Sequence, residues 1–358
     1  MWPSTRFTDL VGTDLPLIQA PMIGPKPALA RQASAVGALG SLGCASMTPD
    51  QVRAEAAALR EVTDRPFNLN FFAHVPDPED PARAADWKAR LAPYYAELGL
   101  DPAAPIAVTN RAPFDAVMCA VVEEVRPRVV SFHFGLPPAP LLARVKAAGA
   151  VVLASATTVE EALWLEANGA DAVIAQGAEA GGHRGIFLGD DPARQIGTFA
   201  LVPQIADAVN VPVIAAGAIA DGRGIAAAFA LGADAVQIGT AFLLTPEAGL
   251  SAPYRAALAS APSDATALTN VFTGRPARGI LNRLMREQGP LSPTVPPFPT
   301  AAPPLGPLKA AAEAQGSGDF TALWSGQAGR LAREMPVADL VARLVAETQA
   351  TISRFRTP

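Results

Sequence analysis

The chain has 358 residues, half of them apolar, which suits one large α/β domain with an insertion, or two domains. A net charge of −5 gives no electrostatic footprint for nucleic acid, and no apolar run is long enough to span a membrane. Cys44 and Cys119 make neither a disulfide framework nor a zinc site, and the N-terminus has no signal pattern. We therefore expect a cytoplasmic protein without a bound metal, a nucleic-acid partner or a membrane partner. The oligomeric state, including a homodimer, stays open.

Short β-branched runs alternate with helical stretches through the first two thirds of the chain. The runs predicted as strands are 17–22, 38–44, 67–72, 129–135, 151–156, 171–176, 211–216 and 235–240. Helical patterns cover 27–36, 48–62, 114–125, 141–148, 158–169 and 222–231. Eight strands alternating with helices over roughly 250 residues are typical of a closed TIM (β/α)8 barrel. The alternative is an open doubly wound sheet, whose glycine-rich phosphate loop more often follows the first strand.

Two segments interrupt this alternation. Residues 76–105 are rich in Pro and Asp, with an amphipathic helix at about 84–98, and look like an insertion after the third strand. Residues 260–329 are rich in Pro, Gly and Ala and are too long for a plain connection, so they form a linker or a lid over the barrel mouth. We therefore predict a barrel over 1–259, a lid-like segment over 260–329, and a C-terminal part over 330–358 whose helix docks on the barrel.

A glycine-rich loop directly after the sixth strand carries His183, one of three histidines in the chain. Glycine lets the backbone turn sharply or approach a ligand closely, and histidine exchanges protons near neutral pH. Strand ends at the mouth of a barrel hold the ligand, so His183 is the candidate catalytic residue. The alternative is a flexible loop with a solvated histidine. We expect the neighbouring Glu179 to orient other groups rather than to act as a base.

The seventh and eighth predicted strands end in glycines, where barrels commonly bind phosphate. Gly217 and Gly239 would leave backbone N–H groups free for phosphate oxygens, and Thr240 adds a hydroxyl. The N-terminus of a nearby helix would add a favourable dipole. Each glycine alone is more often a turn residue, but the two together favour phosphate binding.

Polar residues inside apolar strands form a second group of candidates. Asn68 and Asn70 share one face of the third strand, and we expect Asn70 to meet a polar ring system rather than only to satisfy neighbouring backbone. Gln176, at the end of the sixth strand, could do the same. Ser131 and His133 share one face of the fourth strand, with His133 either pointing at the mouth or buried and hydrogen-bonded.

The remaining candidates have ordinary structural interpretations. We expect His74 to be a surface residue and Cys44 to pack as a small apolar group. Four arginines, for which a solvated face is the safer interpretation, follow the predicted barrel: Arg275, Arg278, Arg283 and Arg286. The segment from Thr273 to Pro276 could nevertheless reach an anion.

Together these motifs resemble the nitronate monooxygenases, formerly called 2-nitropropane dioxygenases. The resemblance covers nearly the whole chain, and the runs 131–137 and 323–327 are similar to the bacterial class I branch. The matching segments are 19–22, 67–72, 131–137, 175–185, 215–222, 237–240, 272–279 and 323–327. One departure is Ala218, where the family pattern has a second glycine.

The resemblance implies noncovalent FMN in the barrel mouth and oxidation of an alkyl nitronate, such as propionate 3-nitronate, by O2 to a carbonyl compound and nitrite. His183 takes the catalytic position, and His133 and Ser131 contact the substrate. The implied FMN contacts are Met22, Asn70, Gln176, Gly181, Gly217, Gln237, Ile238, Gly239 and Thr240. The alternatives are an NAD(P)H-dependent quinone or enoyl reductase on the same FMN barrel and a non-catalytic barrel that binds a phosphate ligand.

Overall fold

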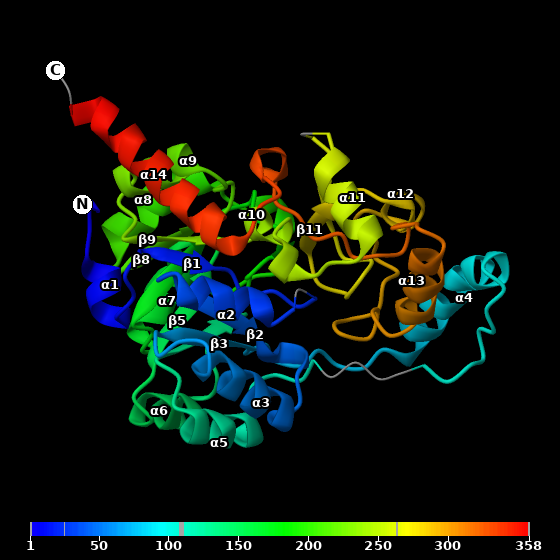
Figure 1. The fold of residues 1–358 in the computed structure, drawn as a ribbon. Coiled ribbons are helices and arrows are strands. Elements are labelled where there is room, and N and C mark those ends of the chain that lie inside the picture. The colour runs from blue at the N-terminus through cyan, green and yellow to red at the C-terminus, as the bar shows by residue number, and fades with distance from the viewer. Residues whose placement is uncertain (1, 25, 107–110, 263, 357–358) are drawn as a thin grey trace.

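A parallel β-barrel forms the larger part of the molecule (Figure 1). The computed structural model describes residues 2–24, 26–106, 111–262 and 264–356. The barrel strands are β1 (Leu17–Gln19), β2 (Gly40–Gly43), β3 (Phe67–Phe72), β4 (Val129–His133), β5 (Val151–Ala156), β6 (Ala172–Gln176), β8 (Val213–Ala216) and β9 (Ala235–Ile238). β1 pairs with β9, and Ile18 bridges to Leu39 just before β2, which closes the ring. The predicted TIM barrel is confirmed.

Alternation of side chains along the strands produces two apolar layers. On β6, Ile174 belongs to the cluster inside the barrel, whereas Val173 and Ala175 pack toward the surrounding helices. Helix α1 (Arg6–Val11) adds the fully buried Phe7 and Val11 to the inner cluster. The interior is therefore a packed core, and space for a ligand remains at the carboxyl ends of the strands.

Helices surround the barrel in chain order. They are α2 (Ala28–Ala35), α3 (Pro49–Arg60), α5 (Ala116–Val125), α6 (Ala139–Ala147), α7 (Val159–Ala167), α8 (Thr198–Ala208) and α9 (Gly222–Ala230). The helix directly after β9, α10 (Thr240–Leu243), is a single turn. The C-terminal helix α14 (Val337–Arg356) packs against both α9 and α2 and so takes the place of the eighth barrel helix.

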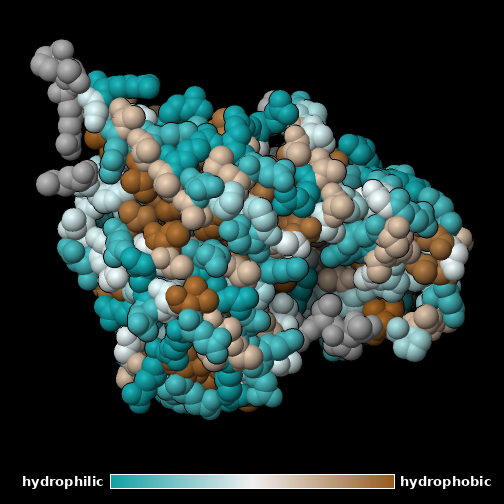
Figure 2. Space-filling view, viewed as in Figure 1, coloured by the Kyte–Doolittle hydropathy of each residue, from teal (hydrophilic) through white to brown (hydrophobic). Residues whose placement is uncertain are grey.

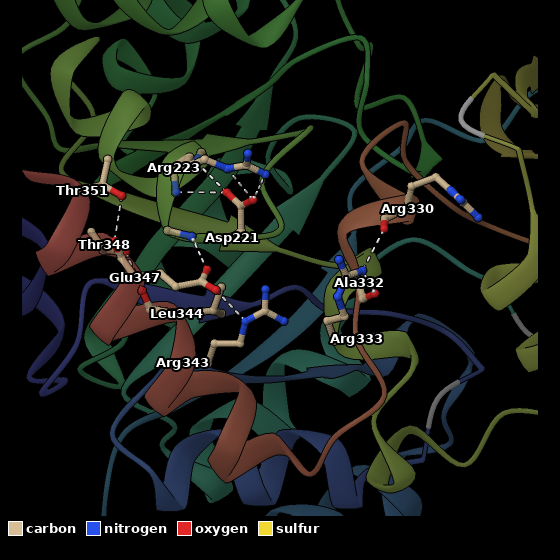
Figure 3. A network of polar contacts seen from close by, with 12 residues as sticks. Asp221, Arg223, Arg330, Ala332, Arg333, Arg343, Leu344, Glu347, Thr348 and Thr351 are labelled. Atoms are coloured by element: carbon tan, nitrogen blue, oxygen red, sulfur yellow. Dashed lines mark hydrogen bonds and ion pairs between the residues drawn. The ribbon is translucent and has the colours of Figure 1, made fainter.

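The contact between α14 and α9 depends on a glycine and a carboxylate (Figure 3). A Cβ at Gly222 would lie 2.3 Å from backbone atoms of Glu347 and Thr348, so only glycine permits this approach. The Glu347 carboxylate accepts a hydrogen bond from the Gly222 N–H at 3.0 Å and one from Arg343 at 2.6 Å. This carboxylate therefore caps α9 from a different helix.

The two segments that interrupt the barrel alternation pack together as a smaller lobe, on the right in Figure 1. Its helices are α4 (Pro81–Glu97), α12 (Arg283–Gln288) and α13 (Leu305–Ala314), and α11 (Ala252–Ser260) leads into it. The indole of Trp87 is fully buried and donates to the Ala301 carbonyl at 3.1 Å, and Tyr95 donates to Pro304 O at 2.6 Å. The insertion thus has its own hydrophobic core with the late segment. Figure 2 shows the surface hollowed between this lobe and the barrel.

A three-stranded antiparallel sheet joins the lobe to the barrel mouth. It contains β7 (Gly182–His183), β11 (Ala277–Ile280) and β10 (Thr266–Thr269), in the order β10-β11-β7. These strands are not evident from the sequence, because β7 is two residues long and gains its partners from a segment about ninety residues away. Helix α8, which contains Pro203, is not evident from the sequence either. Within the described ranges, no helix combines the length and hydropathy of a membrane-spanning segment.

Candidate active site

A cavity of about 500 Å³ opens at the carboxyl ends of the barrel strands and extends under the smaller lobe. Most of the residues predicted from the sequence meet there. They are Met22, Asn70, His133, Gln176, Gly181, His183, Gly217, Gln237, Gly239 and Thr240. The structure describes all the predicted site residues, and two of them, Ser131 and Ile238, do not line the cavity. Each of these two is 1% exposed.

The backbone of His183 is held from two sides. Its carbonyl accepts from Nε2 of Gln176 at 2.9 Å and from Nε2 of His133 at 3.1 Å. The other end of the Gln176 amide, Oε1, accepts from the Gly185 N–H at 2.8 Å. On the other edge of β7, His183 pairs with Ala277 of the antiparallel strand β11. Gln176 and His133 therefore position the loop, which makes β7 a rigid support for the His183 ring.

The His183 ring is half-buried, and its Nε2 lies 2.9 Å from the Thr273 hydroxyl. That hydroxyl also lies 3.3 Å from the Arg275 carbonyl, which can only accept. We therefore assign the Nε2–H of His183 as donor to Thr273 Oγ1, which places the ring's lone pair on Nδ1. Burial, followed by the charges of Arg111, His133 and Arg275, lowers the pKa of His183 well below 6.5. The ring is neutral at pH 7.

His133 is neutral for the same main reason, because burial lowers its pKa to about 4. Its Nε2 faces a carbonyl, so the hydrogen is on Nε2, and Nδ1 accepts from the Ser155 hydroxyl at 3.1 Å. The geometry thus selects one tautomer of the ring. Ser155 itself lines the cavity.

A ladder of amides and hydroxyls runs inside the barrel beneath the cavity. Nδ2 of Asn68 and Nδ2 of Asn70 each lie 2.8 Å from Ser131 Oγ, and Asn68 also donates to Ser41 Oγ at 3.0 Å. As predicted, the two asparagines share one face of β3. Asn68 is a fully buried core amide, whereas Asn70 lines the cavity and is oriented from below by Ser131.

The glycines at the ends of β8 and β9 face the cavity for different reasons. Gly217 has φ of 119°, and a Cβ there would lie 2.7 Å from Thr198 Oγ1. Gly239 has an ordinary φ of −106°, and a Cβ there would meet only Ala20 and Met22, at 3.6 and 3.9 Å. The protein's own packing therefore does not require glycine at 239, and a Cβ there would have only ordinary contacts.

The expected helix dipole at this end of the barrel is not available from α9. Asp221 Oδ1 accepts from the N–H groups of Arg223 and Gly224, and Glu347 accepts from Gly222. The first turn of α9 is therefore already capped by carboxylates. Ala218, which lines the cavity just before it, adopts φ of 56°, a left-handed conformation that glycine adopts without strain.

Two further features of the cavity concern Gln237 and Gly181. The side-chain Oε1 of Gln237 is buried, lines the cavity and has no hydrogen-bond partner among the described residues. A buried acceptor is normally paired, so this oxygen is available to an N–H donor of a molecule in the cavity. Gly181 lies against the backbone of Gly326, where a Cβ would approach to 2.5 Å. This contact brings the segment 323–327 to the cavity.

Comparison with known proteins shows the family of this chain. The family model described as nitronate monooxygenase matches residues 4–347. The chain belongs to the nitronate monooxygenase family. The nitronate monooxygenase of Pseudomonas aeruginosa is 46% identical over 347 residues, covering 96% of this chain and 98% of that protein. The resemblance inferred from the sequence motifs is thereby confirmed, and members of this family are flavoproteins.

Solved structures agree with the family assignment. A nitroalkane oxidase from Streptomyces ansochromogenes superposes with a TM-score of 0.88 at 40% identity, covering 98% of this chain and 99% of that one. FabK from Thermotoga maritima superposes less closely, with a TM-score of 0.73 at 28% identity and 99% coverage of both chains. The fold and the nitronate monooxygenase assignment therefore extend over both lobes.

Two expectations about individual residues were wrong. His74 is not a surface residue, because it is 5% exposed and its ring lies edge-on to Phe298 with centroids 5.0 Å apart. Of the four arginines, Arg283 and Arg286 lie on the helix α12, where Arg286 is exposed, but Arg275 and Arg278 do not lie on a solvated face. Arg278 is 9% exposed on β11, and the Arg275 guanidinium lies 4.5 Å from the Phe134 ring centroid. Both errors have one cause: the segment after the barrel folds back over the mouth.

Other expectations agree with the geometry. The Glu179 carboxylate accepts from the N–H and the hydroxyl of Thr198, each at 2.8 Å, so it orients the start of α8. Cys44 is 1% exposed, and burial raises the pKa of its thiol to about 12. A thiol with that pKa is not a nucleophile at neutral pH.

Several residues that line the cavity were missed from the sequence. Arg111, Ser155, Tyr254 and Trp324 all line the cavity. Ser155 lies at the end of β5 and could have been found from the strand-end rule used for Gln176. Arg111 and Tyr254 carry no such signal, because packing of the two lobes brings them to the cavity.

Proposed function

We propose that this protein oxidises alkyl nitronates, propionate 3-nitronate among them, with O2 to carbonyl compounds and nitrite, using FMN bound noncovalently in the barrel mouth. Membership of the nitronate monooxygenase family supports the reaction class. One observation carries the proposal at the level of residues. A neutral histidine, His183, stands on a rigid support at the cavity wall with the lone pair of Nδ1 unused by Thr273.

The residues present fit a flavin. The unpaired Oε1 of Gln237 would accept from a ring N–H, and Asn70 and Met22 would contact the ring from the ends of β3 and β1. The open position at Gly239, with Gly217 and Thr240, would hold the phosphate. Gln176, Gly181 and Ile238 complete the proposed cofactor set: Gln176 and Gly181 at the cavity wall and Ile238 through its backbone. When bound, FMN supplies the electron transfer between the nitronate and O2.

His183 acts on the substrate's α-carbon proton. A neutral nitroalkane must lose this proton before oxidation, and Nδ1 of the neutral ring is the acceptor, as in general base catalysis. A preformed nitronate has already lost it and needs only to be held in place. His133 lies next to the His183 backbone and contacts the substrate from there, while Ser131 acts one layer below through Asn70.

A direct assay of the purified holoenzyme tests the proposal. With ethyl nitronate in air and without any nicotinamide, we expect O2 uptake and stoichiometric release of nitrite. The matched measurement mixes the enzyme with NADPH or NADH and a quinone, and we expect little oxidation of the nicotinamide. Fast oxidation of NAD(P)H without nitrite release from any nitronate would refute the proposal and favour the reductase alternative.

A further inference from the structure

Four arginines lie near the His183 loop, and three of them are already engaged by protein groups. Arg184 donates three hydrogen bonds to protein acceptors, and Arg278 donates two. The Arg275 guanidinium stacks over the Phe134 ring at 4.5 Å. None of these three lines the cavity within the described chain. They stabilise the sheet and the lobe rather than a ligand.

Arg111 differs from them in two respects. It lines the cavity, and its Nη1 is buried without a hydrogen-bond partner among the described residues. Burial lowers the pKa of its guanidinium below 12.5, yet arginine stays protonated at neutral pH. A buried guanidinium nitrogen without an acceptor is costly, so a ligand in the cavity that accepted from Nη1 would remove this cost.

The charge of Arg111 acts at the same place as His183. Among the charged neighbours that lower the pKa of His183, Arg111 has the largest effect. Because both His183 and His133 are neutral, neither ring supplies a positive charge to an anionic substrate. Lys309 is the other cation that lines the cavity within the described residues, but it is exposed, at the rim. The inner end of the cavity therefore has one desolvated cation beside the proposed base.

We propose that Arg111 is the residue that binds the negatively charged nitronate group of the substrate. A guanidinium presents parallel N–H donors that match two oxygens in one plane, as a nitronate displays them. The proposal rests on the proposed function and assigns its anion-binding group. Arg111 holds the charge, and His183 remains neutral to handle a proton.

The test compares the holoenzyme with Arg111→Gln, Arg111→Lys and the control Arg90→Gln. Arg90 carries the same charge on α4, exposed and paired with Asp86, so its replacement should change nothing. For Arg111→Gln we expect KM for ethyl nitronate to rise about 10- to 100-fold, as for loss of a charged hydrogen bond, with FMN retained. Arg111→Lys keeps the charge but loses the paired N–H donors of the guanidinium, so its KM should lie between those of the wild type and Arg111→Gln.

A binding measurement separates this proposal from the proposed function. Nitrate is a planar, unreactive anion with oxygens on nitrogen, and its affinity for each holoenzyme is measured by calorimetry. We expect Arg111→Gln to weaken nitrate binding by the same factor as it raises KM. If the wild type forms no nitrite from nitronates but nitrate binding still depends on Arg111, the proposed function fails and the anion site stands.

Three results would overturn the proposal. A loss confined to propionate 3-nitronate, with ethyl nitronate unaffected, would mean that Arg111 binds a distal carboxylate. Loss of FMN from Arg111→Gln would make it a cofactor contact. An unchanged KM together with unchanged nitrate affinity would make it a structural residue.

Discussion

The buried ring of His74 makes the fold sensitive to acid. Its pKa is lowered to about 4, first by burial and then by the charge of Arg275, whereas an unfolded chain has the ordinary value of 6.5. Between these two values the unfolded state binds more protons than the folded state, so stability is lost as pH falls below 6.5. Linkage gives a loss of about 2 kcal/mol from this residue between pH 7 and pH 5.

His74→Phe should remove this loss. The ring already lies edge-on to Phe72, Phe134 and Phe298, with centroids 5.0 to 6.2 Å apart, so an aromatic replacement suits the cluster. The replacement also removes Nδ1, which is buried and has no partner among the described residues. Any packing change affects both pH values alike, so the pH 7 measurement serves as the internal control.

The measurement is urea unfolding of both proteins at pH 7 and pH 5. We expect the free energy of unfolding to fall by about 2 kcal/mol less for His74→Phe than for the wild type. Phe298→Leu perturbs the same cluster but keeps the titrating ring, so it should lower stability at both pH values by a similar amount. Equal losses of stability for His74→Phe and the wild type between the two pH values would refute the reasoning.

Three further changes test the site. Gly239→Val should fold, because its Cβ has ordinary contacts, but should purify mostly without FMN; full flavin absorbance would show that the phosphate lies elsewhere. His183→Asn should keep FMN and lose roughly 10²- to 10⁴-fold in turnover of neutral nitroalkanes, with a smaller loss for preformed nitronates. Equal small losses with both substrate forms would make His183 structural and direct attention to His133. Ala218→Gly should raise the free energy of unfolding by about 0.5–1 kcal/mol, because φ of 56° strains alanine; a lower value in urea unfolding would contradict this.

Much of the barrel and the inner wall of the cavity could be predicted from the sequence, for a local reason. The hydrophobic periodicity of a strand or helix can be recognised from neighbouring residues, and the carboxyl ends of parallel strands meet at one end of the barrel. Residues at strand ends, such as Asn70, Gln176 and Gly239, were therefore expected at the mouth before any contact was known. The loop after β6 carried His183 to the same place.

The barrel, the family and the strand-end residues of the site thus follow from local sequence patterns. The outer wall of the cavity does not, since it depends on contacts between distant segments, as between Trp87 and Ala301, 214 residues apart. The protonation states of His183 and His133 likewise depend on the tertiary structure, because burial and neighbouring charges shift a pKa away from the value of the residue type. His183 is neutral because burial lowers its pKa, and the groups that bury it, such as Thr273, come from segments distant in the sequence.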